Sequence, residues 1–321
     1  MIACANPELA EIRISGKTFY VPSAEICGQT VVLTGKWLRT ATVKDEELVE
    51  GEIVRDPAVF IKQIGKTALR PDILSFAQKV PDVTARHTYY TEWDNEAVVA
   101  ITTYQDWLMN RAEYDVRKAV KKAARLGVVV KRIEFGDALV RGIVDIYNNN
   151  PIRQGKPFWH YQKDFETIKH ETSTYLERSE FIGAYYQDEL IGFIKMVYVD
   201  RIAKTLHVIS KTSHYDKKST NALLAKAIEI CAQKGVTHLV YGNFEYGGAS
   251  NSLGEFKRRH GFEKVLFPRY FIPLTLKGKV ALKLRLHHGP KVMVPKSLRR
   301  LLRRLRASFY ALIQARSETK S

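Results

Sequence analysis

Two adjacent lysines followed by two hydroxyl side chains stand in the stretch "HYDKKSTNALL", at Lys217, Lys218, Ser219 and Thr220. The apolar-periodic run that follows them predicts a helix over residues 219–235, so these four residues mark a helix start. Ammonium groups bind phosphate as point charges, and a helix start attracts anions. The stretch therefore predicts a phosphate-binding turn. The alternative interpretation is a solvated basic turn whose hydroxyl group caps the helix.

A second group of polar and aromatic residues lies in the non-periodic segment "NNNPIRQGKPFWHYQKDF", residues 148–165. Loops of this length and composition more often bind a ligand than merely connect two elements. We expect the loop to recognise an acceptor substrate; the alternative is an aromatic loop anchored to the core. Its candidate binding residues are Arg153, Gln154, Trp159, His160 and Tyr161.

Composition narrows the class of protein. The chain has 321 residues, of which 45% are hydrophobic and 11% aromatic, as in globular proteins with a sizeable core. No run of about 18 apolar residues occurs, so no membrane-spanning helix is expected. Three distant cysteines (Cys4, Cys27 and Cys231) exclude a disulfide framework and a cysteine-rich metal site. The nine histidines show no metal-binding spacing, so we expect no metal. No signal-peptide pattern is found, which favours a cytoplasmic location.

The net charge of +17 is unevenly distributed. From Thr275 onward the chain has thirteen basic residues and a single acidic one, Glu318. Residues 296–316 combine an apolar stripe at helical spacing with a cluster of arginines. This pattern predicts an amphipathic helix on an anionic membrane surface, which would make the protein peripheral to the inner face of the membrane. The alternatives are docking onto the protein's own core and contact with tRNA.

The order of predicted elements indicates a mixed α/β fold. In the first half we expect short strands within 12–35, a helix over 57–79 interrupted by Pro71, a strand over 87–101 and a helix over 104–127. Residues 111–132 carry eight basic side chains, which form either a solvated helix face or an RNA-binding one. The expected elements of the second half are helices at 136–148 and up to about 176, strands at 180–186, 190–199 and 203–210, a helix at 219–235, a strand at 237–244, a short helix after 250 and a strand at 263–275.

The end of this order resembles the GNAT superfamily of N-acyltransferases. In that family the short helix reads Asn, small residues, then Leu-Tyr-x-x-x-Gly-Phe; here the segment is "NSLGEFKRRHGF", within a resemblance that covers about 155–275. The first half, with "RKAVKKAARLGV", is similar to the first of two GNAT-like units in Fem-type peptidoglycan aminoacyltransferases and in GNAT acyltransferases linked to surface polysaccharides. The resemblance implies a degenerate unit over 1–130, an acyltransferase unit over 131–275 and a basic tail over 276–321.

Acyl transfer to an amine requires a base, a donor to the oxyanion and a carbonyl-binding edge. Lys257 stands where the family has its tyrosine, so the resemblance implies that its ammonium group stabilises the oxyanion or protonates the leaving group; the alternative is a surface lysine in a basic run. The strand end "YGNFEYGG" provides Asn243, Glu245 as the candidate base, and Tyr246. Glu245 is otherwise an exposed turn residue. The backbone around Ser210 and Lys211 is the expected carbonyl-binding edge.

The donor is left open between acyl-CoA and aminoacyl-tRNA. GNAT enzymes that use acyl-CoA carry a glycine-rich loop for the pyrophosphate, and here Lys218 and Thr220 occupy its glycine positions. Acyl-CoA is the usual donor of enzymes with the GNAT fold. The changed loop and the basic charge favour aminoacyl-tRNA instead, the donor of Fem-type enzymes. We expect an N-acyltransferase that acts on an amine acceptor, such as a lipid-linked cell-envelope precursor. The rival is a non-catalytic GNAT-like scaffold that binds membrane or nucleic acid.

Overall fold

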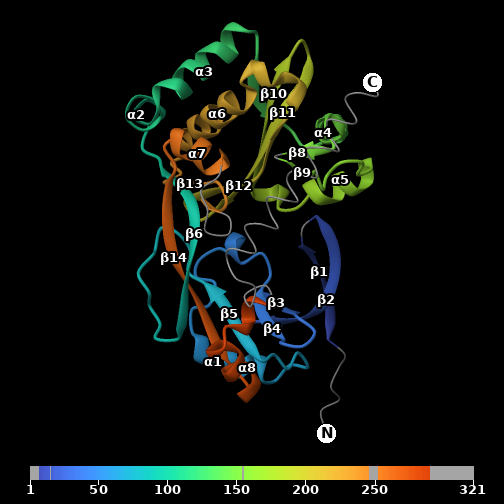
Figure 1. The fold of residues 1–321 in the computed structure, drawn as a ribbon, viewed down its shortest axis with the longest axis vertical. Coiled ribbons are helices and arrows are strands. Elements are labelled where there is room, and N and C mark those ends of the chain that lie inside the picture. The colour runs from blue at the N-terminus through green and yellow to red at the C-terminus, as the bar shows by residue number, and fades with distance from the viewer. Residues whose placement is uncertain (1–6, 15, 154, 246–251, 290–321) are drawn as a thin grey trace.

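A single sheet of twelve strands runs the length of the molecule (Figure 1). The structure, a computed structural model, describes residues 7–14, 16–153, 155–245 and 252–289. The strand order is β1-β2-β3-β4-β5-β14-β6-β13-β12-β11-β10-β7, and β8 and β9 form a separate hairpin. The strands are β1 (Glu8–Ile14), β2 (Lys17–Ile26), β3 (Gln29–Thr34), β4 (Thr40–Val43), β5 (Ile73–Ala77), β6 (Tyr90–Ala100), β7 (Val129–Ile133), β8 (Ile152–Arg153), β9 (Lys156–Pro157), β10 (Ser179–Tyr186), β11 (Glu189–Val199), β12 (Ile202–Ser210), β13 (His238–Val240) and β14 (Glu263–Pro273).

Helices cover both faces of the sheet in the second half (Figure 1). Alternate residues of β11 enter different cores: Ile194 packs with α6, while Phe193 packs with α4 on the opposite face. This alternation follows from the two-residue period of a strand. The helices are α1 (Pro57–Ile64), α2 (Tyr104–Asp106), α3 (Tyr114–Arg125), α4 (Asp137–Asn148), α5 (Phe165–Thr172), α6 (Ser219–Gln233), α7 (Ser252–Arg259) and α8 (Leu276–Lys283), with short turns η1 (Glu46–Leu48), η2 (Trp107–Arg111), η3 (Leu176–Arg178), η4 (Thr212–Lys217) and η5 (Leu286–His288).

Strand β14 joins the two halves of the chain. It lies between β5 and β6 and pairs antiparallel with both. Its Phe267, Tyr270 and Ile272 enter a core that is otherwise built mainly from the first hundred residues. The mixed α/β class is confirmed. Because strands of both expected units belong to one sheet, the division of the chain near residue 130 stays a prediction.

Strands β12 and β13 diverge in the middle of the sheet. They pair in parallel only at Ile202–His238, Ala203–Leu239 and Lys204–Val240. Beyond these pairs β12 continues to Ser210 while β13 has ended. The backbone edge of β12 after Lys204 therefore has no strand beside it in the described part of the chain, and its polar groups are open to a ligand on that side.

Two of the expected elements are wrong. The expected helix over 57–79 ends as α1 at Ile64, and Ile73–Ala77 is the fully buried strand β5, because a short apolar run fits a buried strand as well as a helix. The expected helix over 104–127 is broken before α3 at Ala112, which has extended backbone. The basic helix is correspondingly shorter: Lys131 and Arg132 lie on β7.

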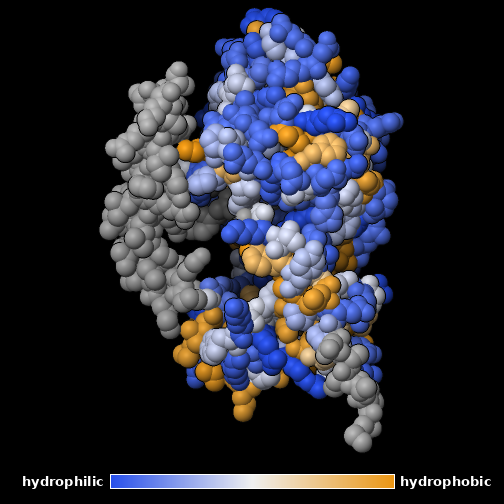
Figure 2. Space-filling model, turned by 90° about the vertical axis from the view of Figure 1, so that its right-hand side faces the viewer, coloured by the Kyte–Doolittle hydropathy of each residue, from blue (hydrophilic) through white to orange (hydrophobic). Residues whose placement is uncertain are grey.

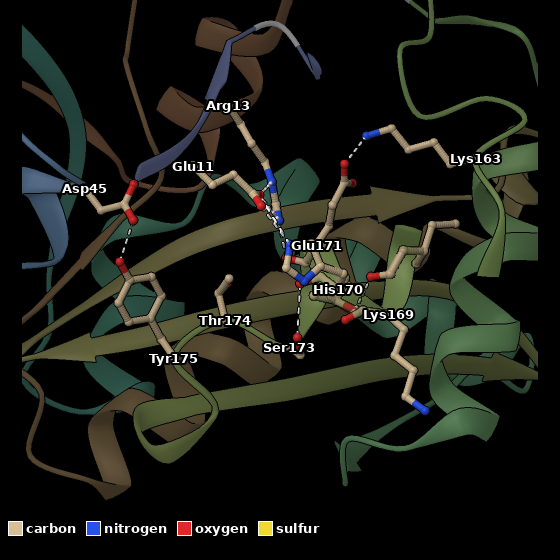
Figure 3. Close-up of polar contacts among 12 residues, drawn as sticks. Glu11, Arg13, Asp45, Lys163, Lys169, His170, Glu171, Ser173, Thr174 and Tyr175 are labelled. Carbon is tan, nitrogen blue, oxygen red and sulfur yellow. Dashed lines mark hydrogen bonds and ion pairs between the residues drawn. The ribbon is translucent and has the colours of Figure 1, made fainter. Parts of the chain in front are cut away.

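Polar contacts tie the edge strand β1 to the second half of the chain (Figure 3). Arg13 donates to the carbonyl oxygen of Glu171, and Glu11 pairs with His170 at 3.1 Å. Farther along, the hydroxyl of Tyr175 donates to Asp45 at 2.5 Å (Figure 3).

The basic segment 296–316 lies outside the described residues, so its contact with a membrane stays a prediction. Within the described ranges, none of the helices has the length and apolar character that a membrane crossing requires. The face of the molecule in Figure 2 is mostly hydrophilic in its upper half, and apolar residues gather over its lower half.

Candidate functional site

A cavity of about 920 Å³ opens where β12 and β13 diverge. Its walls come from five parts of the chain: the end of β12, the start of α6, one face of α3, the helix α7 and the loop that carries β8 and β9. Its cationic lining residues are Lys118, Lys122, Arg153, Lys211, Lys218 and Arg259, against the single carboxylate of Asp115. We call this space the basic cavity.

The basic turn places one of its two lysines in the basic cavity. Lys218 lines the cavity with Ser219 and Thr220, and it has the left-handed backbone conformation (φ 58°) that a glycine would adopt most easily. The backbone N–H groups of Ser219 and Thr220, at the start of α6, have no acceptor among the described residues. Lys217 does not line the cavity; it pairs with Asp216 at 3.1 Å and stacks over the Tyr186 ring.

The end of β12 is engaged by its neighbours. The carbonyl oxygen of Ser210 accepts from Arg153 Nη2 at 2.8 Å, and its hydroxyl lies 2.9 Å from that of Thr220. The backbone N–H of Lys211 donates to Ile191 at 2.7 Å, and its ammonium group pairs with Glu189 at 2.6 Å. Both residues line the basic cavity as expected, but the amide of Lys211 is already used by the sheet.

The loop residues 153–161 divide into two sets. Arg153 lines the basic cavity, its Nε is buried without a partner in the described part of the chain, and burial lowers its pKa. His160 instead packs in the core against Tyr147, and burial lowers its pKa to about 3. Trp159 is 59% exposed beside Gly16, and Tyr161 donates its N–H to Phe158. Trp159, His160 and Tyr161 thus lie outside the basic cavity. Gln154 and Tyr246 lie outside the described residues.

Lys257 is fully buried and anchors the end of β13. Its Nζ donates to the carbonyl oxygens of Tyr241 at 2.5 Å and Asn243 at 2.8 Å, and lies 4.4 Å from the Tyr241 ring centroid. Burial lowers the pKa of Lys257 to about 8. Because Lys257 is buried, the alternative of a surface lysine is wrong. Lys257 does not line the basic cavity, so a role at the oxyanion stays a prediction.

Glu245 lies away from the basic cavity. Its carboxylate pairs with Lys264 at 2.8 Å, and its backbone N–H donates to Asn95 at 2.8 Å. Its carboxylate is engaged by this lysine and does not line the basic cavity, so a role as the base stays a prediction. Asn243 lines a different space, described next.

A second pocket, of about 340 Å³, lies next to the basic cavity at the same divergence. The two share no lining residue, and consecutive residues of the segment after β13 reach different ones: Tyr241 the basic cavity, Gly242 and Asn243 the second pocket. Thr205 of β12 lines it as well. Its charged lining residues are Glu46, Glu47, Lys79, Asp94, Glu96, Lys204 and Arg269. We call it the mixed-charge pocket.

Sequence reasoning missed a buried pair in the wall of the basic cavity. His260 is 1% exposed, its Nδ1 donates to the carbonyl oxygen of Phe256 at 2.7 Å, and its Nε2 accepts from the amide of Asn221 at 3.1 Å. Burial lowers the pKa of His260 to about 4, so the ring is neutral at pH 7. The only feature of the sequence that points to His260 is its position just before the Gly-Phe pair. For Lys118 and Lys122, which also line the cavity, the basic charge of their helix is a clearer indication.

Three potential metal ligands meet away from both pockets. Glu92 Oε1 lies 3.0 Å from His287 Nε2 and 2.9 Å from His288 Nε2. Hydrogen bonds account for this group, and no residue of it lines the basic cavity or the mixed-charge pocket. The expectation of no metal stays a prediction.

No protein-family model and no curated protein sequence matches the chain. Solved structures do. FemX superposes with a TM-score of 0.56 over 86% of this chain and 90% of its own, at 11% identity. The fold is that of FemX.

Two further structures share this Fem-type fold. They are the C-terminal domain of a putative lysylphosphatidylglycerol synthetase from Agrobacterium fabrum (TM-score 0.51, 13% identity, 82% of this chain and 87% of that one) and L-PGS from Bacillus licheniformis (TM-score 0.52, 13% identity, 83% and 88%). At these identities the likeness concerns the fold, and the expected Fem-type fold is confirmed.

Proposed function

We propose that the protein is an acyltransferase that moves an aminoacyl group from an aminoacyl-tRNA to the amine of an acceptor. The observation that carries the proposal is the basic cavity at the divergence of β12 and β13. Four of its cations, Lys118, Lys122, Arg153 and Lys218, form no ion pair with any described carboxylate. Uncompensated cations around a concave site attract a ligand with several phosphates.

The distribution of these positive side chains favours a nucleic-acid donor over a coenzyme. The cations of α3 continue outside the cavity, at Arg117, Lys121 and Arg125, along a helix about 18 Å long. Such a stripe fits successive phosphates of an RNA backbone. The sequence resemblance supports the same donor, because Fem-type enzymes use aminoacyl-tRNA.

The reaction is an exchange of an ester for an amide. The acceptor ammonium first loses one proton, and its nitrogen then attacks the carbonyl carbon of the aminoacyl ester. As the C–N bond forms, the negative oxygen is stabilised by the open backbone edge of β12 between Thr205 and Ser210. The bond from the carbonyl carbon to the ribose oxygen then breaks, and a second proton moves from the nitrogen to that oxygen. The expected catalytic roles of Lys257, Glu245 and Asn243 stay predictions.

Acyl-CoA is the second candidate donor. One observation favours it: Lys218, at a glycine position of the family's phosphate loop, has the left-handed backbone that suits glycine, and the N–H groups of Ser219 and Thr220 have no acceptor among the described residues. A coenzyme pyrophosphate would bind these groups, with Lys218 as an additional charge.

The acceptor is proposed to be a lipid-linked cell-envelope precursor at the inner face of the membrane. The basic amphipathic pattern of residues 296–316 supports this location through its attraction to anionic lipid. The rival function is a scaffold without catalytic activity, which would bind membrane or nucleic acid through the same charges.

The experiment measures binding of the purified full chain to acetyl-CoA and to charged and uncharged tRNA by calorimetry at two salt concentrations. A preference for charged over uncharged tRNA supports the proposed donor. Saturable binding of acetyl-CoA that persists at the higher salt would replace tRNA by the coenzyme. Equal binding of charged and uncharged tRNA without binding of acetyl-CoA, or binding of neither ligand, would favour the scaffold.

A further inference from the structure

We propose that the mixed-charge pocket binds the ammonium group of the acceptor through Glu47, which then accepts one of its protons. The inference rests on the proposed acyl transfer and names a binding pocket and a catalytic residue for its acceptor amine.

The position of the pocket carries the first step. Its wall includes Thr205 of β12 and Gly242 and Asn243 just after β13, the residues at which the two strands separate. The basic cavity reaches the same divergence through Tyr241 and Ser210. A donor in the basic cavity and an acceptor in the mixed-charge pocket would therefore meet at one opening in the sheet, as attack of the amine on the carbonyl carbon requires.

The pairing of charges carries the second step. Arg269 lies between Asp94, at 2.6 Å, and Glu46. Lys204 pairs with Glu96 at 2.7 Å, and Lys79 pairs with Asp200 at 3.1 Å.

Glu47 is the exception. Among the described residues, no cation pairs with its carboxylate, which is engaged only by the backbone N–H of Glu47 itself. The pocket thus presents one uncompensated negative charge, which selects a cation such as an ammonium group.

The surroundings of Glu47 suit proton transfer. Its side chain reaches solvent, and the pocket wall around it partly desolvates the carboxylate, which raises its pKa. Asp45 and Glu46 act in the same direction, while a hydrogen bond from the backbone N–H of Glu47 and the charge of Lys204 lower the pKa. The other charged groups that line the pocket are Lys79, Asp94, Glu96 and Arg269. A carboxylate with a raised pKa is a better general base than an ordinary one.

The proton inventory balances without a further reactant. The bound R–NH3⁺ gives one proton to the Glu47 carboxylate and becomes R–NH2, which attacks the donor ester. The second proton travels with the leaving ribose hydroxyl, and Glu47 returns its own proton to solvent. The products are an amide, uncharged tRNA and one released proton.

The test compares the full-length wild-type chain with Glu47→Gln and with Glu50→Gln, a control of the same residue type three positions away that is exposed and does not line the pocket. The probe is 1,5-diaminopentane, with 1,5-pentanediol as its uncharged analogue, and binding is measured by calorimetry. We expect the diamine but not the diol to bind the wild type. Glu47→Gln should weaken diamine binding about tenfold or more, and Glu50→Gln should leave it within about twofold.

Transfer of a radiolabelled aminoacyl group to the diamine is measured with the same variants. Glu47→Gln should lower the rate about 100-fold, and Glu47→Asp should restore part of it. Equal diamine binding and equal transfer by wild type and Glu47→Gln would overturn the inference, as would a wild type that ignores the diamine or prefers the diol. Binding of charged tRNA is recorded in parallel and should not change in Glu47→Gln. Its absence in the wild type would reject the proposed donor instead, so the two failures are distinguishable.

Discussion

The basic cavity and the mixed-charge pocket lie at one divergence of strands but are built on opposite electrostatic plans. The basic cavity gathers cations from α3, α6 and the β8–β9 loop and leaves four of them unpaired. The mixed-charge pocket matches each of its cations with a carboxylate and leaves Glu47 over. One space attracts phosphate and the other attracts ammonium. Two substrates of opposite charge can therefore bind side by side without competing.

The largest effect is expected from removal of the ammonium group of Lys257, which anchors the segment between the basic cavity and the mixed-charge pocket. Lys257→Met keeps the length of the side chain but leaves the carbonyl oxygens of Tyr241 and Asn243 without their ammonium donor. We expect a loss of about 4 kcal/mol in the free energy of unfolding, measured with urea, because buried polar groups lose their partner. Lys264→Met, which removes an exposed ion pair with Glu245, should cost less than about 1 kcal/mol. Equal effects would show that Lys257 has no such anchoring role.

Reversing the charge of the basic cavity should separate the two spaces. The double variant Lys118→Glu, Lys122→Glu should weaken binding of charged tRNA about 100-fold at low salt and reduce the salt dependence, because two phosphate contacts are lost. Diamine binding in the mixed-charge pocket should stay unchanged. The comparison variant is Lys121→Glu, Arg125→Glu, in the part of the proposed RNA-binding stripe that lies outside the cavity lining, and it should weaken tRNA binding less than the cavity variant does. A loss of the same size in the comparison variant would mean that the whole helix, and not the cavity, binds the donor.

The buried imidazole of the basic cavity should give the protein a characteristic pH dependence. The pKa of His260 is about 4 in the folded protein, against about 6.5 in the unfolded chain. Between these two pH values the unfolded chain binds a proton on His260 and the folded protein does not. The free energy of unfolding is therefore unaffected by His260 above about pH 6.5 and decreases as the pH falls from 6.5 towards 4. We expect His260 to account for about 2 kcal/mol of the difference in unfolding free energy between pH 7.5 and pH 5. His260→Asn should show a smaller difference; an identical pH dependence would contradict the assignment.

The smallest expected effect sharpens the identity of the donor. Lys218→Gly relieves a left-handed backbone but adds chain entropy to the unfolded state, so the free energy of unfolding should change by less than about 1 kcal/mol. If Lys218 contacts RNA phosphate, the salt slope of tRNA binding should fall by about 0.7. Tighter binding of acetyl-CoA by this variant would instead show that the glycine loop, once restored, accepts the coenzyme.

Some of this architecture was readable from the sequence and some was not. The strands β10, β11 and β12 are apolar runs separated by turn residues at 187–188 and 200–201, and Gly261 has the expected left-handed backbone (φ 79°) after α7. The sequence of β5 predicts a helix wrongly, because its five residues are all buried in the structure and therefore lack the alternation of apolar and polar residues that marks a strand. The mixed-charge pocket could not be found, because its walls are assembled from η1, β6, β12 and β14, which lie far apart along the chain.

The candidate site shows the same division. Lys218, Arg153 and Ser210 were predicted and do line the basic cavity, because each stands at the end of a recognisable element. His160 stands among polar residues in the sequence, but in the structure its ring packs against Tyr147. Only tertiary contacts determine whether such a residue binds a ligand or packs against the core. Glu47 belongs to a short turn with no motif, and its importance comes from the partners that its neighbours already have.

Strand β14 has a consequence for how the protein is made and how it can change. Since this strand is synthesised after nearly all the rest of the described core, β5 and β6 must wait on the ribosome with unpaired edges until residues 263–273 emerge. Exposed edges of this kind recruit other chains, so a fragment that stops near residue 130 should aggregate. The first half is therefore not a module that can be expressed, exchanged or inherited by itself.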